Sequence, residues 1–215
     1  MKYLIVTGGA LDEKFVVDVI KNGGYEVIIA VDSGMDFCYN SNIMPDVIVG
    51  DFDSVGIEAL NFFQRQEQMD IHKLNPEKND TDTEYALRFA IERGATRVTV
   101  LGGTGSRIDH VLGNISMLGV GMENNVFVEL LDAHNKIRMI NSSLTIKKEE
   151  CFGKYVSICP ISEKVVGVTI TGVKYPLDNY DMYGFNTLGI SNEIVDDEAT
   201  ISIKDGILLV IESND

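Results

Sequence analysis

Over the first 131 residues, the apolar positions follow two alternating patterns. Short continuous apolar runs, typical of strands buried on both faces, alternate with stretches whose apolar residues recur every three or four positions, as in helices. Strands are predicted at 2–7, 26–31, 45–50, 69–74, 96–101 and 126–131, and helices at 12–21, 56–68, 82–93 and 108–120. This order predicts an α/β domain over residues 1–131, with a mostly parallel sheet and helices on both faces.

The pattern changes after residue 131. Short β-type runs punctuated by glycine, asparagine and aspartate follow one another, and no helical periodicity intervenes. These runs lie at 136–140, 143–147, 155–159, 165–171, 199–203 and 207–211. We therefore expect a second domain over residues 132–215, a small all-β sandwich or barrel.

Composition narrows the classes of partner. The 215 residues carry 33 acidic and 18 basic side chains, a formal net charge of -15. Binding to nucleic acid or to an anionic membrane is therefore disfavoured, because both require a basic surface. No segment approaches the roughly 20 apolar residues of a membrane span, and no signal peptide is recognisable. Three cysteines without CxxC spacing favour a reducing compartment, so we expect a cytoplasmic protein.

Part of the acid excess lies where a parallel sheet places its ligand site, beyond the carboxyl ends of the strands. Asp32 directly follows one predicted strand, and Asp51 and Asp53 directly follow the next. Two carboxylates two residues apart can share a cation such as Mg²⁺, which prefers oxygen ligands. The alternative is a turn in which Asp53 only caps the following helix.

A second acidic cluster opens the helix predicted at 82–93. Asp80, Asp82 and Glu84 have a structural explanation, because the helix dipole favours anions at its N-terminus. However, two acidic clusters at one sheet edge repel each other unless a cation lies between them. The presence of both clusters therefore favours a metal site.

A glycine-rich loop follows the strand predicted at 96–101. Glycines allow backbone N–H groups to approach phosphate oxygens, and a guanidinium can grip a phosphate with two hydrogen bonds. The segment matches neither a Walker A loop nor the dinucleotide-binding fingerprint, and a plain strand–helix turn is the alternative. Asp109 and His110 could orient a substrate or a proton, or Asp109 could cap the helix. The candidate residues are Gly102, Gly103, Thr104, Gly105, Ser106, Arg107, Asp109 and His110.

Five segments in a fixed order resemble the bacterial thiamine pyrophosphokinase family, also called thiamine diphosphokinase. They are GDFDS at 50–54, EKNDTDTEYAL at 77–87, GGTGSRIDHVLGN at 102–114, TGVKYPL at 171–177 and TLGISNE at 187–193. The resemblance implies an α/β domain followed by a β-sandwich domain, in a homodimer with the active site at its interface. It implies transfer of pyrophosphate from ATP to the hydroxyl of thiamine, which gives thiamine diphosphate and AMP and requires Mg²⁺.

The resemblance also implies roles for individual residues. The α/β domain would bind nucleotide and Mg²⁺, and the β-sandwich domain would bind thiamine and dimerise. The metal and phosphate ligands would be Asp51, Asp53 and Asp82, and the further catalytic residues would be Arg107, Asp109 and His110. Asp32, Asn114 and the glycine-rich loop would bind substrate. Ser191 and Asn192 would belong to the thiamine pocket.

Two departures from the family pattern leave questions open. Asn79 stands where the family commonly has an aspartate, with Asp80 as a possible replacement, and Ser33 replaces a glycine next to Asp32. The proton acceptor is either Asp109 or His110. Two other functions also remain open: a DxD-dependent glycosyl- or nucleotidyltransferase, and a non-catalytic sensor of nucleotide or thiamine.

Overall fold

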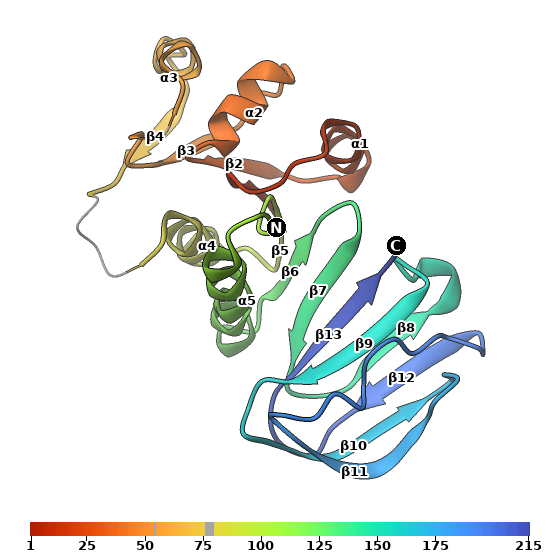
Figure 1. The fold of residues 1–215 in the computed structure, drawn as a ribbon. Helices are drawn as coiled ribbons and strands as arrows, with labels where there is room; N and C mark the ends of the chain where they lie inside the picture. Colours follow the sequence, from red (N-terminus) through yellow and green to blue (C-terminus); the bar gives the residue numbers. More distant parts are fainter. Residues whose placement is uncertain (54, 76–79) are drawn as a thin grey trace. The chain divides into compact units, whose positions relative to one another are not determined.

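The computed structural model describes residues 1–53, 55–75 and 80–215 (Figure 1). Ser54 and residues 76–79, and with them the question of Asn79, lie outside the described residues. The chain forms two compact units, Met1–Ala133 and His134–Asp215. None of the helices in the described part of the chain combines the length and apolar character that a bilayer crossing requires.

The first unit contains a parallel sheet. Its strands are β1 (Lys2–Val6), β2 (Val27–Val31), β3 (Val47–Gly50), β4 (Asp70–Lys73), β5 (Arg97–Leu101) and β6 (Phe127–Leu131). They are ordered β4-β3-β2-β1-β5-β6, and each neighbouring pair is parallel. All carboxyl ends of these strands therefore lie at one edge of the sheet.

Helices cover the two faces of this sheet. Figure 1 shows α1 (Glu13–Gly23), α2 (Gly34–Asn40) and α3 (Ile57–Gln64) on one face, and α4 (Asp82–Glu92) and α5 (Ile108–Glu123) on the other. Local chemistry explains where helices begin: the side chain of Asp12 accepts the backbone N–H of Phe15 at the start of α1. The prediction of a parallel sheet with helices on both faces is confirmed.

The second unit is a β-sandwich. One group of antiparallel strands runs β7 (Asn135–Ile140), β13 (Leu208–Ser213) and β9 (Tyr155–Pro160). The other sheet is ordered β11 (Leu177–Tyr183), β10 (Lys164–Thr171), β12 (Glu198–Ser202) and β8 (Leu144–Lys147). Side chains of both groups, among them Ile158, Val168 and Val210, share one buried core. The only helical turn in its described residues is a 3₁₀ turn at Lys148–Glu150, so the predicted all-β sandwich is confirmed.

Besides the 3₁₀ turn, one helix and one strand escaped prediction. Helix α2 has seven residues, begins at a glycine and has no side-chain cap, so its sequence carries little helical signal. Strand β11 reads LDNYDMY, and only Met182 is fully buried. This strand is stabilised by antiparallel pairing with β10. A mostly polar sequence does not predict such pairing.

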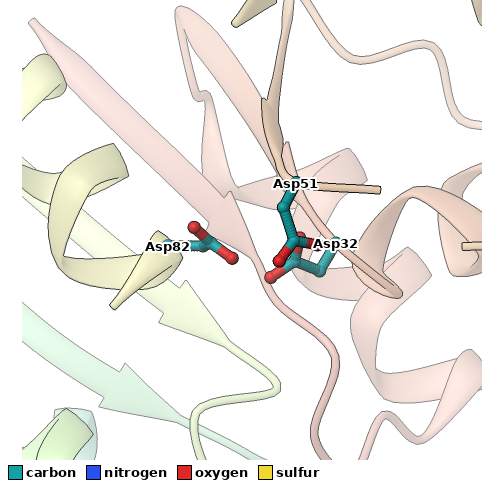
Figure 2. Close-up of side chains that lie close together, drawn as sticks. All are labelled: Asp32, Asp51 and Asp82. Carbon is teal, nitrogen blue, oxygen red and sulfur yellow. The ribbon is translucent and has the colours of Figure 1, made fainter. Parts of the chain in front are cut away.

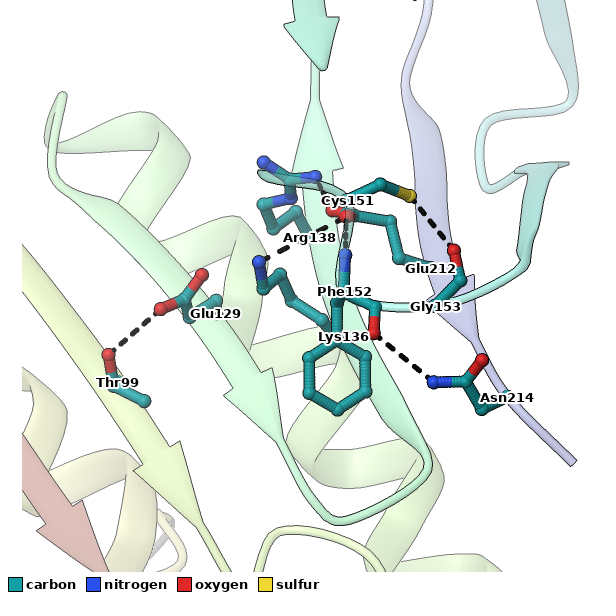
Figure 3. A network of polar contacts seen from close by, with 9 residues as sticks. All are labelled: Thr99, Glu129, Lys136, Arg138, Cys151, Phe152, Gly153, Glu212 and Asn214. Atoms are coloured by element: carbon teal, nitrogen blue, oxygen red, sulfur yellow. Dashed lines mark hydrogen bonds and ion pairs between the residues drawn. The ribbon is translucent and has the colours of Figure 1, made fainter. Parts of the chain in front are cut away.

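A buried ion cluster lies inside the sandwich (Figure 3). The side chain of Glu212 on β13 is 1% exposed and forms an ion pair with Arg138 on β7. Its other oxygen lies 4.0 Å from Lys136 Nζ and accepts the backbone N–H of Phe152 at 2.7 Å. Because every polar atom removed from water needs a partner, this carboxylate fixes the segment that precedes β9 against β7 and β13.

Candidate active site

Three carboxylates converge at the carboxyl edge of the parallel sheet (Figure 2). Asp32 follows β2, Asp51 follows β3, and Asp82 is the first residue of α4. Each offers one oxygen, and these oxygens all lie within 4.8 Å of one another. Figure 2 shows Asp82 pointing toward the other two from the opposite side. This geometry suits a divalent cation with oxygen ligands, because without one the three negative charges repel.

Asp53 does not belong to this convergent set. Asp51 Oδ1 accepts the backbone N–H of Asp53 at 3.0 Å, and Phe52 between them has a positive φ of 69°. This is an Asx-type turn, as the alternative reading of GDFDS expected. The expected capping by Asp53 is wrong, because α3 begins after Gly56 and has no side-chain cap. The turn leaves Asp53 exposed, and the third carboxylate near Asp51 and Asp82 is that of Asp32.

Backbone contacts hold Asp32 in an unusual conformation. Its φ is 47°, in the left-handed region that non-glycine residues seldom adopt. Its N–H donates to Val49 O at 3.1 Å, and its carbonyl accepts the N–H of Met35 at 2.8 Å. Strand β3 and helix α2 thus together fix the backbone from which this carboxylate projects.

Side-chain hydroxyls organise the start of α4, which carries Asp82. Thr81 caps the helix, because its Oγ1 accepts the N–H of Glu84 at 3.2 Å. The next hydroxyl, Thr83 Oγ1, lies 3.0 Å from Thr7 Oγ1 at the end of β1. Asp80 borders the cavity that is described below, but its side chain is exposed and lies 3.8 Å from that of Arg88.

The glycine-rich loop packs against a second glycine segment that sequence reasoning did not single out. Gly9 N donates to Gly102 O at 2.9 Å, and Ala10 N donates to Thr104 O at 2.7 Å. A Cβ on Gly9 would lie 2.2 Å from both acceptor oxygens, so only glycine permits this approach. The available signal was Gly8-Gly9 directly after the first strand.

Charged side chains border the loop at the start of α5. Arg107 binds Asp109 through two hydrogen bonds, Nη2–Oδ2 at 2.5 Å and Nε–Oδ1 at 3.2 Å. These bonds lower the pKa of Asp109 to about 2. His110 is the next residue and is exposed. One turn further, Asn114 Nδ2 donates to Gly103 O at 2.8 Å, so this amide supports the loop backbone.

These groups share one cavity of about 810 Å³ within the first unit. Of the residues expected at the site, the following line it: Asp32, Asp51, Asp82, Gly102, Gly103, Thr104, Gly105, Ser106, Arg107, Asp109, His110 and Asn114. The cavity is thus lined by carboxylates, by the backbone of the glycine-rich loop and by a guanidinium. That arrangement can bind a phosphorylated ligand together with its cation.

The two residues expected from the second unit have structural contacts of their own. Asn192 is 7% exposed, and its Oδ1 accepts the N–H of Tyr175 at 3.0 Å while its Nδ2 donates to Tyr175 O at 2.8 Å. Ser191 has a φ of 59°, and its N–H donates to Ser157 Oγ at 2.9 Å. Asn192 therefore joins the TLGISNE segment to TGVKYPL, and it leaves the ring of Tyr175 exposed.

The fold and cavity define a class of protein. A parallel α/β sheet whose strand-end carboxylates share a cavity with a glycine-rich loop is typical of enzymes that bind phosphorylated ligands at that edge.

Comparison with known proteins identifies the family. The family description "Thiamin pyrophosphokinase, catalytic domain" matches residues 22–128, and "Thiamin pyrophosphokinase, vitamin B1 binding domain" matches residues 141–208. Thiamine pyrophosphokinase of Bacillus subtilis is 36% identical over 188 residues, which are 87% of each chain. The chain belongs to the thiamine pyrophosphokinase family, whose members are transferases.

Solved structures agree with this membership. The crystal structure of the Bacillus subtilis thiamine pyrophosphokinase superposes with a TM-score of 0.89 and 32% identity, covering 100% of both chains. That of the Geobacillus thermodenitrificans enzyme gives 0.86 and 32%, covering 100% of this chain and 98% of the other. The order of an α/β domain and a β-sandwich is thus the fold of this family.

Proposed function

We propose that this protein transfers a pyrophosphoryl group from ATP to the hydroxyl of thiamine and releases AMP and thiamine diphosphate. The observation that carries the proposal is the convergence of Asp32, Asp51 and Asp82 within 4.8 Å, in a region that matches the family's catalytic domain. Membership of the family supplies the identity of the substrates.

The three convergent carboxylates fit a Mg²⁺ ion. The donor set is all oxygen, and three negative charges so close together are unfavourable without a cation. Bound there, Mg²⁺ would offset the negative charge of the triphosphate. We propose that Asp32, Asp51 and Asp82 hold it, and that Asp53 contributes through the turn it forms with Asp51.

The glycine-rich loop and Arg107 would hold the phosphates. Backbone N–H groups of residues 102–106 can donate to phosphate oxygens, and Arg107 can exchange its two bonds to Asp109 for two bonds to a phosphate. Asn114 supports the backbone of the loop by donating a hydrogen bond to Gly103 O. Catalysis of this kind depends on position and charge more than on covalent chemistry, which suits these groups.

Attack by thiamine requires a group that accepts the hydroxyl proton. Asp109 is a weak base while Arg107 holds its pKa at about 2. His110 borders the same cavity and offers an imidazole, which commonly accepts protons near neutral pH. We propose His110 as the proton acceptor and Asp109 as the group that keeps Arg107 oriented until a phosphate arrives.

The second unit would supply the thiamine site. Support comes from its match to a family domain described as binding vitamin B1. We propose that Ser191 and Asn192 shape this site, Asn192 through its two bonds to the Tyr175 backbone, and that the thiamine site is completed at the interface of a homodimer.

We also propose that the enzyme is cytoplasmic. Its three cysteines are free, which supports this proposal, because disulfides are rare in that compartment.

The decisive experiment is a product assay with the full chain. Incubation with ATP, Mg²⁺ and thiamine should give AMP and thiamine diphosphate in equal amounts, separated by chromatography. Omission of Mg²⁺ should stop product formation. Release of ADP, or ligand-induced stabilisation of folded protein without any product, would reject the proposed reaction; the second result would favour a sensor. Sedimentation analysis tests the dimer separately.

A further inference from the structure

Two buried hydroxyls meet between elements that are distant in sequence. Thr7 follows β1 and Thr83 lies in the first turn of α4, and each is 7% exposed. Their Oγ1 atoms are 3.0 Å apart, a hydrogen bond across 76 residues of chain. Both residues border the cavity that contains the three carboxylates.

Thr7 is fixed relative to the glycine-rich loop. Its N–H donates to Leu101 O at 2.9 Å, and Gly102 follows Leu101 with a φ of 73°. A Cβ at position 102 would lie 2.2 Å from Thr7 O, so the two backbones are in close contact. The backbone that carries the Thr7 hydroxyl therefore cannot shift unless the glycine-rich loop shifts with it.

Thr83 is the neighbour of Asp82. The cap formed by Thr81 and Glu84 lies within the helix, so it orders the first turn without fixing its place on the sheet. The bond from Thr83 to Thr7 joins this turn to a strand end. Since Asp82 must approach two other carboxylates, repulsion would favour displacement of the turn if that bond were lost.

We propose that the Thr7–Thr83 hydrogen bond is a positioning device for the reaction. It holds Asp82 beside Asp32 and Asp51 and couples these carboxylates to the glycine-rich loop, which lines the same cavity. The inference rests on the proposed function, since it assigns the bond to the cation and phosphate sites of that reaction. Neither threonine is required to touch the reacting atoms.

Thr83→Val tests the device, because valine keeps the shape of threonine and removes the hydroxyl. The Mg²⁺ concentration for half-maximal AMP formation should rise about five-fold, of the order expected when a buried hydroxyl loses its partner. The kcat at saturating Mg²⁺ should stay within about two-fold of wild type. Direct titration with Mn²⁺, in the absence of thiamine, should show a similar loss of affinity.

Two controls separate the hydroxyl from general damage. Thr83→Ser keeps the hydroxyl and should restore both the Mg²⁺ dependence and the Mn²⁺ affinity. Thr145→Val removes a hydroxyl from another threonine pair, in which Thr145 Oγ1 lies 3.1 Å from Thr200 Oγ1 in the second unit. Its cation dependence should equal that of wild type.

Thr7→Val breaks the same bond from the other side. The double variant T7V/T83V should lose less than the product of the two single losses, because the second substitution removes a hydroxyl that has already lost its partner. If T83V does not fold, T7V and Thr7→Ser provide the same comparison. Full additivity in the double variant would mean that the two hydroxyls act independently, contrary to the proposal.

Further outcomes would overturn the inference. One is a T83V protein with wild-type Mg²⁺ dependence and Mn²⁺ affinity, whether or not its melting temperature falls. Another is a T83S protein that behaves as T83V does, which would assign the effect to packing. If the wild-type protein forms no thiamine diphosphate, the proposed function fails, but the Mn²⁺ titrations still decide the role of the threonine pair.

Discussion

Gly50 and Asp32 are in such close contact that position 50 has no room for a side chain. A Cβ at position 50 would lie 2.2 Å from Asp32 Oδ1. The two residues lie side by side on neighbouring parallel strands, since the residues before them, Val31 on β2 and Val49 on β3, are paired. The glycine of GDFDS is therefore explained by a carboxylate on the adjacent strand, in addition to the turn that follows it.

Gly50→Ala should displace the carboxylate of Asp32 and weaken the cation site. We expect kcat/KM to fall by at least tenfold, because a catalytic group displaced by about 1 Å can cost up to two orders of magnitude. The measurement is steady-state kinetics at several Mg²⁺ concentrations. Gly184→Ala is the control, because a Cβ there would meet nothing closer than 3.9 Å. Equal kinetics for G50A and wild type would show that Asp32 tolerates displacement.

Asp32→Asn and Asp53→Asn distinguish two possible sets of cation ligands. The structure brings Asp32 to the oxygens of Asp51 and Asp82, and it leaves Asp53 exposed. We expect Asp32→Asn to weaken Mn²⁺ binding at least tenfold and Asp53→Asn to weaken it less, as measured by calorimetric titration. Melting temperature should hold or rise in Asp32→Asn, because like-charge repulsion is relieved. The reverse order of affinities would restore Asp53 as the third ligand.

The pH dependence of the reaction should identify the proton acceptor. The folded-state pKa of Asp109 is lowered to about 2, so its ion pair with Arg107 is present above the ordinary value of 3.8 and is lost as the pH falls through about 2. Asp109 therefore stays ionised throughout the range in which histidine usually titrates, about pH 5 to 8. At about pH 5 and above, Asp109→Asn should keep the wild-type pH dependence of kcat/KM, whereas His110→Gln should lower kcat/KM by about a hundredfold or more, because it removes the base. A loss of that size in Asp109→Asn, with His110→Gln close to wild type, would assign the proton to Asp109.

Glu212→Gln should destabilise the second unit strongly. Glu212 is 1% and Arg138 11% exposed, so loss of the carboxylate leaves a buried guanidinium without its counter-charge. We expect a loss of about 3 kcal/mol in the free energy of unfolding, measured by urea denaturation. The matched control is Glu150→Gln, which breaks an exposed ion pair with Lys147 and should cost under about 0.5 kcal/mol. Similar losses in both variants would contradict a structural role for the buried cluster.

Sequence patterns were informative where chemistry is local. The apolar runs of β2 (VIIAV) and β3 (VIVG) predicted buried parallel strands, because strands covered on both faces have no solvent side that favours polar residues. The helix predicted at 82–93 begins at Asp82 in the structure, directly after Thr81, a residue type that favours the capping position. Elements without such signals were missed: α2 lacks a cap, and β11 is a polar strand whose partner, β10, supplies its hydrogen bonds.

The sequence by itself determined the two-part architecture and placed carboxylates and glycines after particular strands. It could do so because the periodicity of strands and helices depends on residues that are close together in the chain. Only the tertiary structure decided which carboxylates meet. Asp32, Asp51 and Asp82 come from β2, β3 and α4, and parallel pairing brings the strand ends together. Meanwhile a left-handed residue, Phe52, turns the chain so that Asp53 is exposed. Convergence depends on strand order and backbone conformation, and no local pattern encodes either.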